Sequence, residues 1–323
     1  MVTRTHLSRF SALRSLRRIT IALAIVFVAA VGLLWLLQER LVFVPPPTPN
    51  QQGRGATRVE FNATDGQPLF GFLITPAGAD STNSPTGIIL HFHGNGDLAD
   101  SWLDWAEEVA QRTGLSVFLA EYRGYGGLPG RPTFEGLMRD ARAALSVLDT
   151  EFGTDPSEVV LYAHSLGTGV ATHLALEHTV RALVLEAPIT SVVDVARRNL
   201  GPPLSWVVPL ISRIPLAPVE AVRSIHVPVS VVSGERDDVA PSWMGREVFD
   251  AAIQKGDFLL IPQGEHGNLS TVGGDQYWEF VEKALNGTKG GEPRSITPRS
   301  GGTIKLSYEI GWHVASSWLA ISA

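Results

Sequence analysis

From residue 57 to residue 285, short apolar segments alternate with longer segments of helical periodicity. Strands are expected at 58–61, 69–75, 87–92, 116–120, 159–163, 182–185, 227–232 and 258–261. Helices are expected at 97–112, 134–152, 166–177, 242–255 and 275–285, the second of them capped by Thr133. Continuously apolar strands in repeated strand–helix units predict an α/β fold, with a mostly parallel central sheet and helices on both faces.

An apolar segment near the N-terminus is predicted to cross a membrane. It runs from Ile19 to Leu37, carries no charge and is interrupted only by Thr20 and Gly32. A spanning helix needs about 20 apolar residues, and a buried core helix would show a polar stripe that this segment lacks. A cleaved signal peptide is the alternative, but its apolar region is usually shorter, roughly 7–15 residues. The run also ends in Leu-Leu-Gln-Glu-Arg, a poor cleavage site, so we expect an uncleaved anchor.

The charges around this segment predict its orientation. Five arginines and no acidic residue precede it within residues 1–18, whereas Glu39 and Arg40 cancel on its other side. The positive-inside rule then places the N-terminus in the cytoplasm and the rest of the chain on the periplasmic or extracellular side. A mitochondrial presequence is an alternative, because residues 1–18 are also rich in arginine and serine.

Three further segments complete the predicted domain organisation. Four prolines within 45–49 predict a stiff spacer over 38–56, between the anchor and an α/β domain at 57–285. Residues 189–216 are apolar and interrupted by prolines, which fits either a small lid or an ordinary connection packed on the sheet. Residues 286–323 are expected to form a linker and tail to which the sequence assigns no function.

A serine stands where the predicted strand at 159–163 passes directly into the predicted helix at 166–177. Ala163 and Gly167, two residues before and two residues after Ser165, are both small. A tight strand-to-helix turn needs small side chains at these positions, and it presents the serine hydroxyl as in a nucleophile elbow. The motif alone is common by chance, and its position between a strand and a helix makes Ser165 a candidate nucleophile.

A serine hydroxyl becomes a good nucleophile only when a base removes its proton. His266 follows the last predicted strand, and three acidic residues, Glu235, Asp237 and Asp238, follow the strand before it. Catalytic triads with the chain order nucleophile, acid, histidine are known. Parallel sheets place their active sites at the carboxyl ends of the strands, which is where these residues stand. The spacing does not choose among the three acids.

The same reasoning predicts an oxyanion hole and assigns the other histidines near the strands. The backbone N–H groups of Leu166 and Asn95 are the expected oxyanion donors, because glycines flank Asn95 and let the backbone approach a substrate. His93 is expected to brace this loop, and His164 is expected to pack within the sheet. His91 and His93 have no further ligand at suitable spacing, so no metal is expected, and the chemistry requires no cofactor.

Composition excludes several other kinds of site. The chain contains no cysteine, which rules out disulfides, thiolate metal sites and a cysteine nucleophile. Its net charge of -6 gives no general attraction to nucleic acid, so no nucleic-acid partner is expected.

Several short motifs add a resemblance to a known family. His-Gly-Asn-Gly at 93–96, Glu-Tyr-Arg-Gly-Tyr-Gly at 121–126, Gly-Arg-Pro-Thr at 130–133, Asp-Ala at 140–141 and the serine elbow stand in this order. With them the chain resembles the BEM46-like (ABHD-type) branch of the α/β-hydrolase superfamily over about residues 40–285. The resemblance implies ester or thioester hydrolysis by a Ser-Asp-His triad whose acid is Asp237. Glu121, Ala163 and Asn268 depart from the branch, which commonly has Asp, Gly and Asp there.

Together these observations predict a membrane-anchored serine hydrolase with the triad Ser165, Asp237 and His266. Its expected partners are a small-molecule or lipid-like ester substrate and the membrane, through the N-terminal helix. A peptidase with the same fold is an alternative enzyme. A membrane-tethered binding module without catalysis is the alternative of another class.

Overall fold

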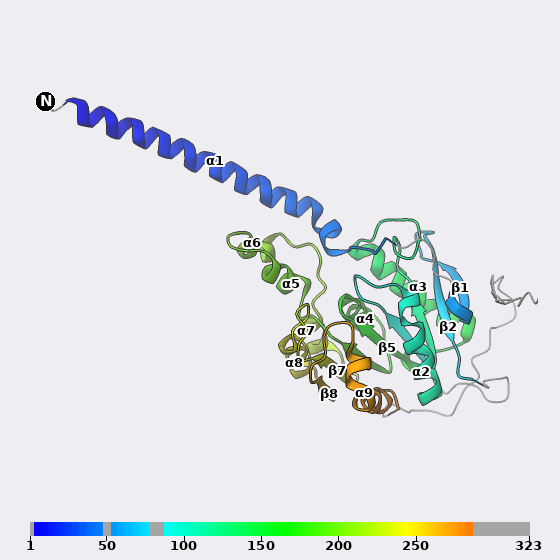
Figure 1. Ribbon diagram of the computed structural model, residues 1–323. Coiled ribbons are helices and arrows are strands. Elements are labelled where there is room, and N and C mark those ends of the chain that lie inside the picture. Colours follow the sequence, from blue (N-terminus) through cyan, green and yellow to red (C-terminus); the bar gives the residue numbers. More distant parts are fainter. Residues whose placement is uncertain (1–2, 48–52, 78–86, 287–323) are drawn as a thin grey trace, which may run out of the picture.

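The computed structural model describes residues 3–47, 53–77 and 87–286, which form an N-terminal helix and an α/β unit (Figure 1). The predicted linker and tail lie outside the described residues from residue 287 onwards, as do residues 48–52 of the predicted spacer. The unit is built on one eight-stranded sheet with the order β1-β2-β4-β3-β5-β6-β7-β8. Its strands are β1 Thr57–Asn62, β2 Pro68–Ile74, β3 Ile88–Phe92, β4 Ser116–Ala120, β5 Val159–His164, β6 Ala182–Glu186, β7 Val229–Gly234 and β8 Lys255–Ile261.

The predicted α/β-hydrolase fold is confirmed. β1 and β2 are antiparallel to their neighbours, whereas β4, β3, β5, β6, β7 and β8 run parallel to one another. Every residue of β3, β4, β5 and β6 is buried, as expected for parallel strands covered on both faces. The carboxyl ends of the parallel strands therefore share one edge of the sheet.

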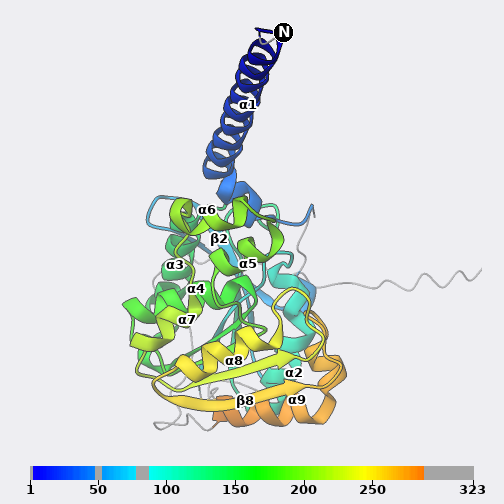
Figure 2. The same cartoon turned by 90° about the vertical axis from the view of Figure 1, so that its left-hand side faces the viewer.

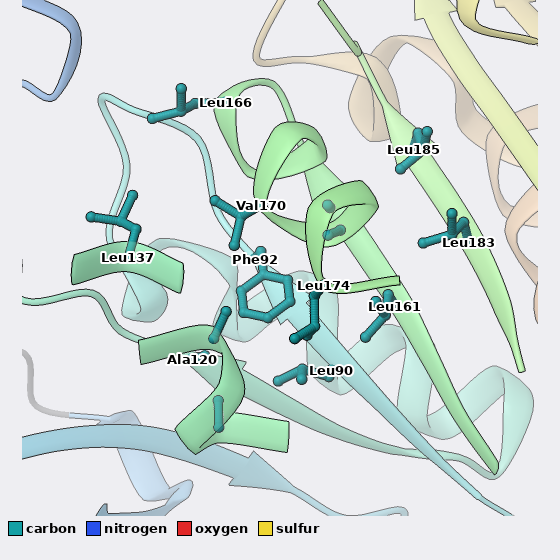
Figure 3. Packing of buried hydrophobic residues seen from close by; sticks show 14 of the residues in the cluster. Leu90, Phe92, Ala120, Leu137, Leu161, Leu166, Val170, Leu174, Leu183 and Leu185 are labelled. Carbon is teal, nitrogen blue, oxygen red and sulfur yellow. The ribbon is translucent and has the colours of Figure 1, made fainter. Parts of the chain in front are cut away.

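Helices cover the two faces of the sheet and bury two hydrophobic clusters. One cluster lies under α2 and α9, the other under α3, α4 and α8. In the second cluster, Val170 and Leu174 of α4 pack on Leu90, Phe92 and Leu161 of the sheet (Figure 3). The bounds are α2 Leu103–Thr113, α3 Phe134–Phe152, α4 Leu166–Glu177, α5 Val192–Asn199, α6 Leu204–Ile211, α7 Pro218–Ala221, α8 Ser242–Ala251 and α9 Leu269–Asn286.

Local sequence determines where several helices begin and end. The Thr133 hydroxyl accepts a hydrogen bond from the Gly136 N–H at 3.0 Å, as predicted for the cap of α3. Gly153 ends the same helix in the left-handed conformation. The predicted helix 97–112 is instead a short 3-10 helix, Ala99–Trp102, followed by α2.

Two predicted helix boundaries are wrong near the end of the domain. The helix predicted to reach residue 255 ends at Ala251, because Lys255 already pairs with Val229 of β7. Gly256 permits this pairing, since a Cβ there would lie 2.2 Å from the Ser230 hydroxyl. The helix predicted from residue 275 begins earlier as part of α9, which is kinked at Gly274.

The N-terminal helix α1, Thr3–Val42, extends beyond the predicted anchor at both ends. Its segment Leu13–Val42 is long and apolar enough to cross a membrane, a property that signal sequences share. Residues 38–42 of the predicted spacer belong to this helix. Phe43, directly after it, is buried in the core of the α/β unit.

Candidate active site

Ser165 occupies a strained turn between β5 and α4. Its φ of 51° and ψ of −119° form a backbone conformation that residues other than glycine rarely adopt. Its N–H donates to the carbonyl of Glu186 in the neighbouring strand at 2.9 Å. A Cβ on Gly167 would lie 2.3 Å from the Phe92 carbonyl oxygen, so only glycine lets α4 begin this close to β3. The small residue expected after the serine thus has a direct steric cause.

The structure brings Ser165, His266 and Asp237 into one hydrogen-bonded chain. His266 Nε2 lies 2.8 Å from Ser165 Oγ, and His266 Nδ1 lies 2.7 Å from Asp237 Oδ2. A neutral imidazole that donates from Nδ1 to the carboxylate leaves Nε2 free to accept the serine proton. The arrangement can therefore activate a hydroxyl nucleophile.

Of the three acids that the sequence left open, only Asp237 reaches His266. Its side chain is fully buried, and its other carboxylate oxygen accepts the N–H groups of Val239 at 2.8 Å and Ala240 at 2.7 Å. Asp238 is exposed, and Glu235 accepts the N–H of Gln263 at 3.2 Å. The backbone turn after Asp237 thus fixes its carboxylate in place.

The two predicted oxyanion donors belong to residues next to Ser165 in the chain or in the neighbouring loop. The Leu166 N–H is in the first turn of α4, where a helix offers no internal acceptor. A Cβ on Gly94 would lie 3.3 Å from the Ser165 Cβ, so the loop that carries Asn95 runs directly against the serine. Within the described part of the chain, no acceptor bonds the backbone N–H of Leu166 or of Asn95. Their role in catalysis stays a prediction.

His93 braces this loop, as the sequence indicated. Its Nδ1 lies 2.8 Å from the Gly94 carbonyl oxygen and its Nε2 lies 2.9 Å from a Glu121 carboxylate oxygen. Glu121 also accepts the Ala99 N–H at 3.1 Å. Since both ring nitrogens face acceptors, both carry a proton. Burial lowers the pKa of His93, but the charge and hydrogen bond of Glu121 outweigh it and raise the pKa.

His164 has a role near the site that sequence reasoning missed. It is buried, as predicted, yet its Nε2 lies 2.9 Å from the His266 backbone oxygen, so it holds the loop that carries the candidate base. Its Nδ1 lies 3.4 Å from Asp97 Oδ2. Burial alone would raise the pKa of Asp97, but the neighbouring His164 lowers it to about 2. Only the position of His164 directly before the serine could have drawn attention to it.

Other polar residues of the predicted motifs hold together the elements around the site. Arg123 donates to Asp140 at 2.6 Å and to Asp65 at 2.8 Å, which joins the motif at 121–126 to α3. His91 packs against Trp102 and Trp105, and burial lowers its pKa. In residues 3–47, 53–77 and 87–286, no three His, Asp or Glu side chains gather as metal ligands.

Comparison with known proteins gives related chains over most of the length. Residues 83–219 match the family described as serine aminopeptidase, S33. The chain is 31% identical over 273 residues to the uncharacterized protein Rv2307c of Mycobacterium tuberculosis, covering 82% of this chain and 94% of that protein. It is 30% identical over 287 residues to the alpha/beta hydrolase domain-containing protein WAV2 of Arabidopsis thaliana, covering 80% and 92%.

Solved esterase structures share the fold at lower identity. The esterase PF2001 of Pyrococcus furiosus superposes with a TM-score of 0.58 at 18% identity, covering 77% of this chain and 98% of that one. A bacterial heroin esterase gives a TM-score of 0.58 at 20% identity, covering 74% and 87%. With these relatives and this topology, the chain belongs to the α/β-hydrolase superfamily.

Proposed function

We propose that this hydrolase cleaves carboxylic ester or thioester bonds with Ser165 as its nucleophile. The single observation that carries the proposal is the relay in which His266 bonds Ser165 at 2.8 Å and Asp237 at 2.7 Å. These distances are within the range at which a base takes a proton from a serine while a buried carboxylate orients it. The strained turn at Ser165 supports the same role.

In the proposed reaction, His266 Nε2 takes the Ser165 proton as Oγ bonds to the acyl carbonyl carbon. The carbonyl oxygen becomes an oxyanion, which the N–H groups of Leu166 and Asn95 stabilise. When the intermediate collapses, the bond to the alcohol or thiol breaks and His266 returns its proton to that leaving group. Water, deprotonated by His266, then attacks the acyl-enzyme, and the acid leaves as Ser165 regains its proton.

We further propose that the protein is a BEM46-like member of the superfamily and keeps α1 as an uncleaved anchor. The motifs at 93–96 and 121–126 support the branch. The proposed topology has the N-terminus in the cytoplasm and the domain at 57–285 outside it, in line with the arginines before the apolar segment. The end of α1 is joined closely to the domain, because Phe43 is buried in the core and Asn95 Nδ2 donates to the Val42 carbonyl at 2.7 Å.

Labelling with a fluorophosphonate probe tests the nucleophile. The wild-type chain should react, and the Ser165→Ala variant should not. Ser157→Ala is the matched control, because Ser157 lies before β5, at the opposite end of that strand from Ser165. Equal labelling of wild type and Ser165→Ala would disprove the assignment. A series of p-nitrophenyl esters of increasing chain length then defines the acyl group.

A peptidase is the second candidate, and the match to the family described as serine aminopeptidase, S33, favours it. Peptide and ester hydrolysis share the acyl-enzyme route, so the triad does not separate them. Aminoacyl p-nitroanilides, tested beside the p-nitrophenyl esters, do so directly. If only the anilides are cleaved, the ester proposal fails. If neither is cleaved and no probe binds, the chain is a binding module.

A further inference from the structure

The helix α6 presents an unusually apolar surface between α5 and the end of α1. Its sequence, Leu-Ser-Trp-Val-Val-Pro-Leu-Ile, contains no charged residue. Leu210 is 83% exposed and Trp206 is 68% exposed, and Leu210 is the most exposed of the large hydrophobic residues whose side chains the structure describes. A water-soluble surface rarely leaves such side chains uncovered side by side on one short helix.

This helix lies beside the end of α1, at the top of the α/β unit in Figure 2. Gln38 of α1 accepts the Arg213 N–H at 2.6 Å and donates to the Ile211 carbonyl at 3.4 Å. The Arg213 guanidinium lies 4.5 Å from the ring centre of Trp35. Both views place α6 along the last turns of α1 rather than at a distance from it (Figures 1 and 2).

The position of these contacts along α1 indicates where α6 lies relative to the bilayer that α1 is proposed to cross. At 1.5 Å per residue the proposed span at 19–37 is about 28 Å long, close to the hydrocarbon thickness of a bilayer, ~30 Å. Trp35 then lies at the outer boundary, where tryptophan is preferred. Because the last residue of α6 contacts Gln38, and Arg213 just after α6 contacts Trp35, α6 lies at that boundary too. The exposed Arg197, Arg198 and Arg213 flank it with positive charge that suits lipid headgroups.

The elements on either side of α6 contact loops of the candidate active site. Arg198, near the end of α5, donates to the backbone oxygen of Asp238 at 3.2 Å, next to the proposed acid. At the opposite side, the Asn95 side chain bonds both the Val42 carbonyl and, at 2.9 Å, the Val44 N–H. A continuous rim thus runs from the acid loop through α5, α6 and the end of α1 to the oxyanion loop.

We propose that α6 lies in the outer headgroup layer of the bilayer that α1 crosses. Resting on the hydrolase function proposed above, it follows that Ser165 receives acyl substrates from this layer across the rim. The occupant of the apolar face is the lipid surface, since a helix of spanning length continues directly into the same rim. A second copy of the chain or another protein on α6 would contradict this assignment.

The absence of cysteine from the chain allows a direct test. The variant Leu210→Cys, labelled with an environment-sensitive fluorophore in the full chain, is reconstituted into phosphatidylcholine vesicles with a minor fraction of phosphatidylglycerol. We expect blue-shifted emission and strong quenching by headgroup nitroxide lipids. The matched control is Ile253→Cys, which is 49% exposed before β8, at the opposite end of the parallel strands, and should stay aqueous and unquenched.

Two outcomes of the labelling experiment would overturn the proposal. One is an aqueous, unquenched label at position 210 in vesicles. The other is a blue shift that also appears in detergent and grows with protein concentration, which would indicate that a second copy covers α6. Neither outcome depends on catalysis, so the test of position remains valid even if the hydrolase proposal fails.

Activity provides the second readout. The variant Leu210→Ser should lower hydrolysis of a long-chain ester embedded in vesicles by about tenfold, because less apolar area anchors the rim in the lipid. Hydrolysis of p-nitrophenyl acetate from water should fall much less. Leu176→Ser, an exposed leucine at the end of α4, should change neither rate. Equal losses of activity on both esters, or no loss on the embedded ester, would disprove the proposed entry of substrate from the lipid layer.

Discussion

His266 and His93 each contact a carboxylate at the same edge of the sheet, at 2.7 Å from Asp237 and 2.9 Å from Glu121. Their other ring nitrogens face different groups. The second nitrogen of His266 faces the hydroxyl of Ser165, whereas that of His93 faces the carbonyl oxygen of Gly94. The His266 side chain is 22% exposed, and the His93 side chain is completely buried.

This difference shows that the chemistry of a histidine–carboxylate pair depends on the group that faces the second ring nitrogen of the histidine. A hydroxyl can donate to an unprotonated nitrogen, so His266 is able to act as a base. A carbonyl oxygen can only accept, so His93 is held as a cation whose charge Glu121 balances. One pair is arranged for proton transfer and the other for holding a loop still.

The largest expected effect separates the two histidines by function. We expect His266→Gln to lower kcat/KM by about 10⁵-fold, because Ser165 loses its base. Its melting temperature should stay close to that of the wild type, since the side chain contributes little to the core. His93→Gln should instead lower the melting temperature clearly. The comparison fails if His266→Gln keeps most of its ester hydrolysis or unfolds as readily as His93→Gln.

A second prediction concerns the acid. We expect Asp237→Asn to lower kcat by about 10⁴-fold, because an amide can donate to Nδ1 and so favours the tautomer that cannot accept the serine proton. Asp238→Asn is the matched control, and kinetics with p-nitrophenyl esters should find it unchanged. If the neighbouring variant causes the larger loss, the acid has been misassigned.

The third prediction tests the buried pair through stability. We expect Glu121→Gln to cost about 3 kcal/mol, because a cation is left buried without its partner. The folded pKa of His93 is raised above its unfolded value, so the stabilisation from the pair is fully present below about pH 6.5. It is lost as the pH rises through the folded pKa.

Urea unfolding of wild type and Glu121→Gln between pH 5.5 and pH 9 measures this dependence. The difference in unfolding free energy should be largest at the acid end and shrink towards alkaline pH. Glu108→Gln, which removes an exposed ion pair with Arg112, should show little change at any pH. A difference that does not vary with pH would mean that His93 is neutral.

Sequence patterns predicted the parts of the fold that depend on neighbouring residues. The bounds of α3, α4 and β4 agree to the residue, because a threonine cap, a small-residue turn and an apolar run are local signals. The strand order was not predictable in this way, because it depends on pairings between segments far apart in the chain, such as Lys255 with Val229.

In the candidate site, too, some features follow from local sequence and others depend on contacts between distant residues. Ser165 and His266 could be chosen from their positions after strands, but the choice of Asp237 over Asp238 depends on a turn whose N–H groups bind only the first carboxylate. The contact of His164 with the backbone of His266 spans a hundred positions in the chain, and no local pattern encodes it.

The smallest predicted effect concerns the Asn95 side chain, which joins the predicted oxyanion loop to the end of α1. The Asn95 side chain ties its loop to Val42 and Val44, and the Tyr125 hydroxyl donates to it at 2.8 Å. We expect Asn95→Ala to lower kcat by about tenfold with a smaller change in KM, because the backbone N–H remains but is held less firmly.

Two conservative variants sharpen this prediction. Asn95→Asp keeps the acceptor for Val44 and Tyr125 but loses the donor to Val42, so its kcat should be intermediate. Tyr125→Phe removes one hydrogen bond of the three and should cost less than Asn95→Ala. Steady-state kinetics on a water-soluble ester measure kcat and KM for each variant. Since oxyanion stabilisation acts on the transition state, a change confined to KM would show that the side chain positions substrate rather than the N–H donor.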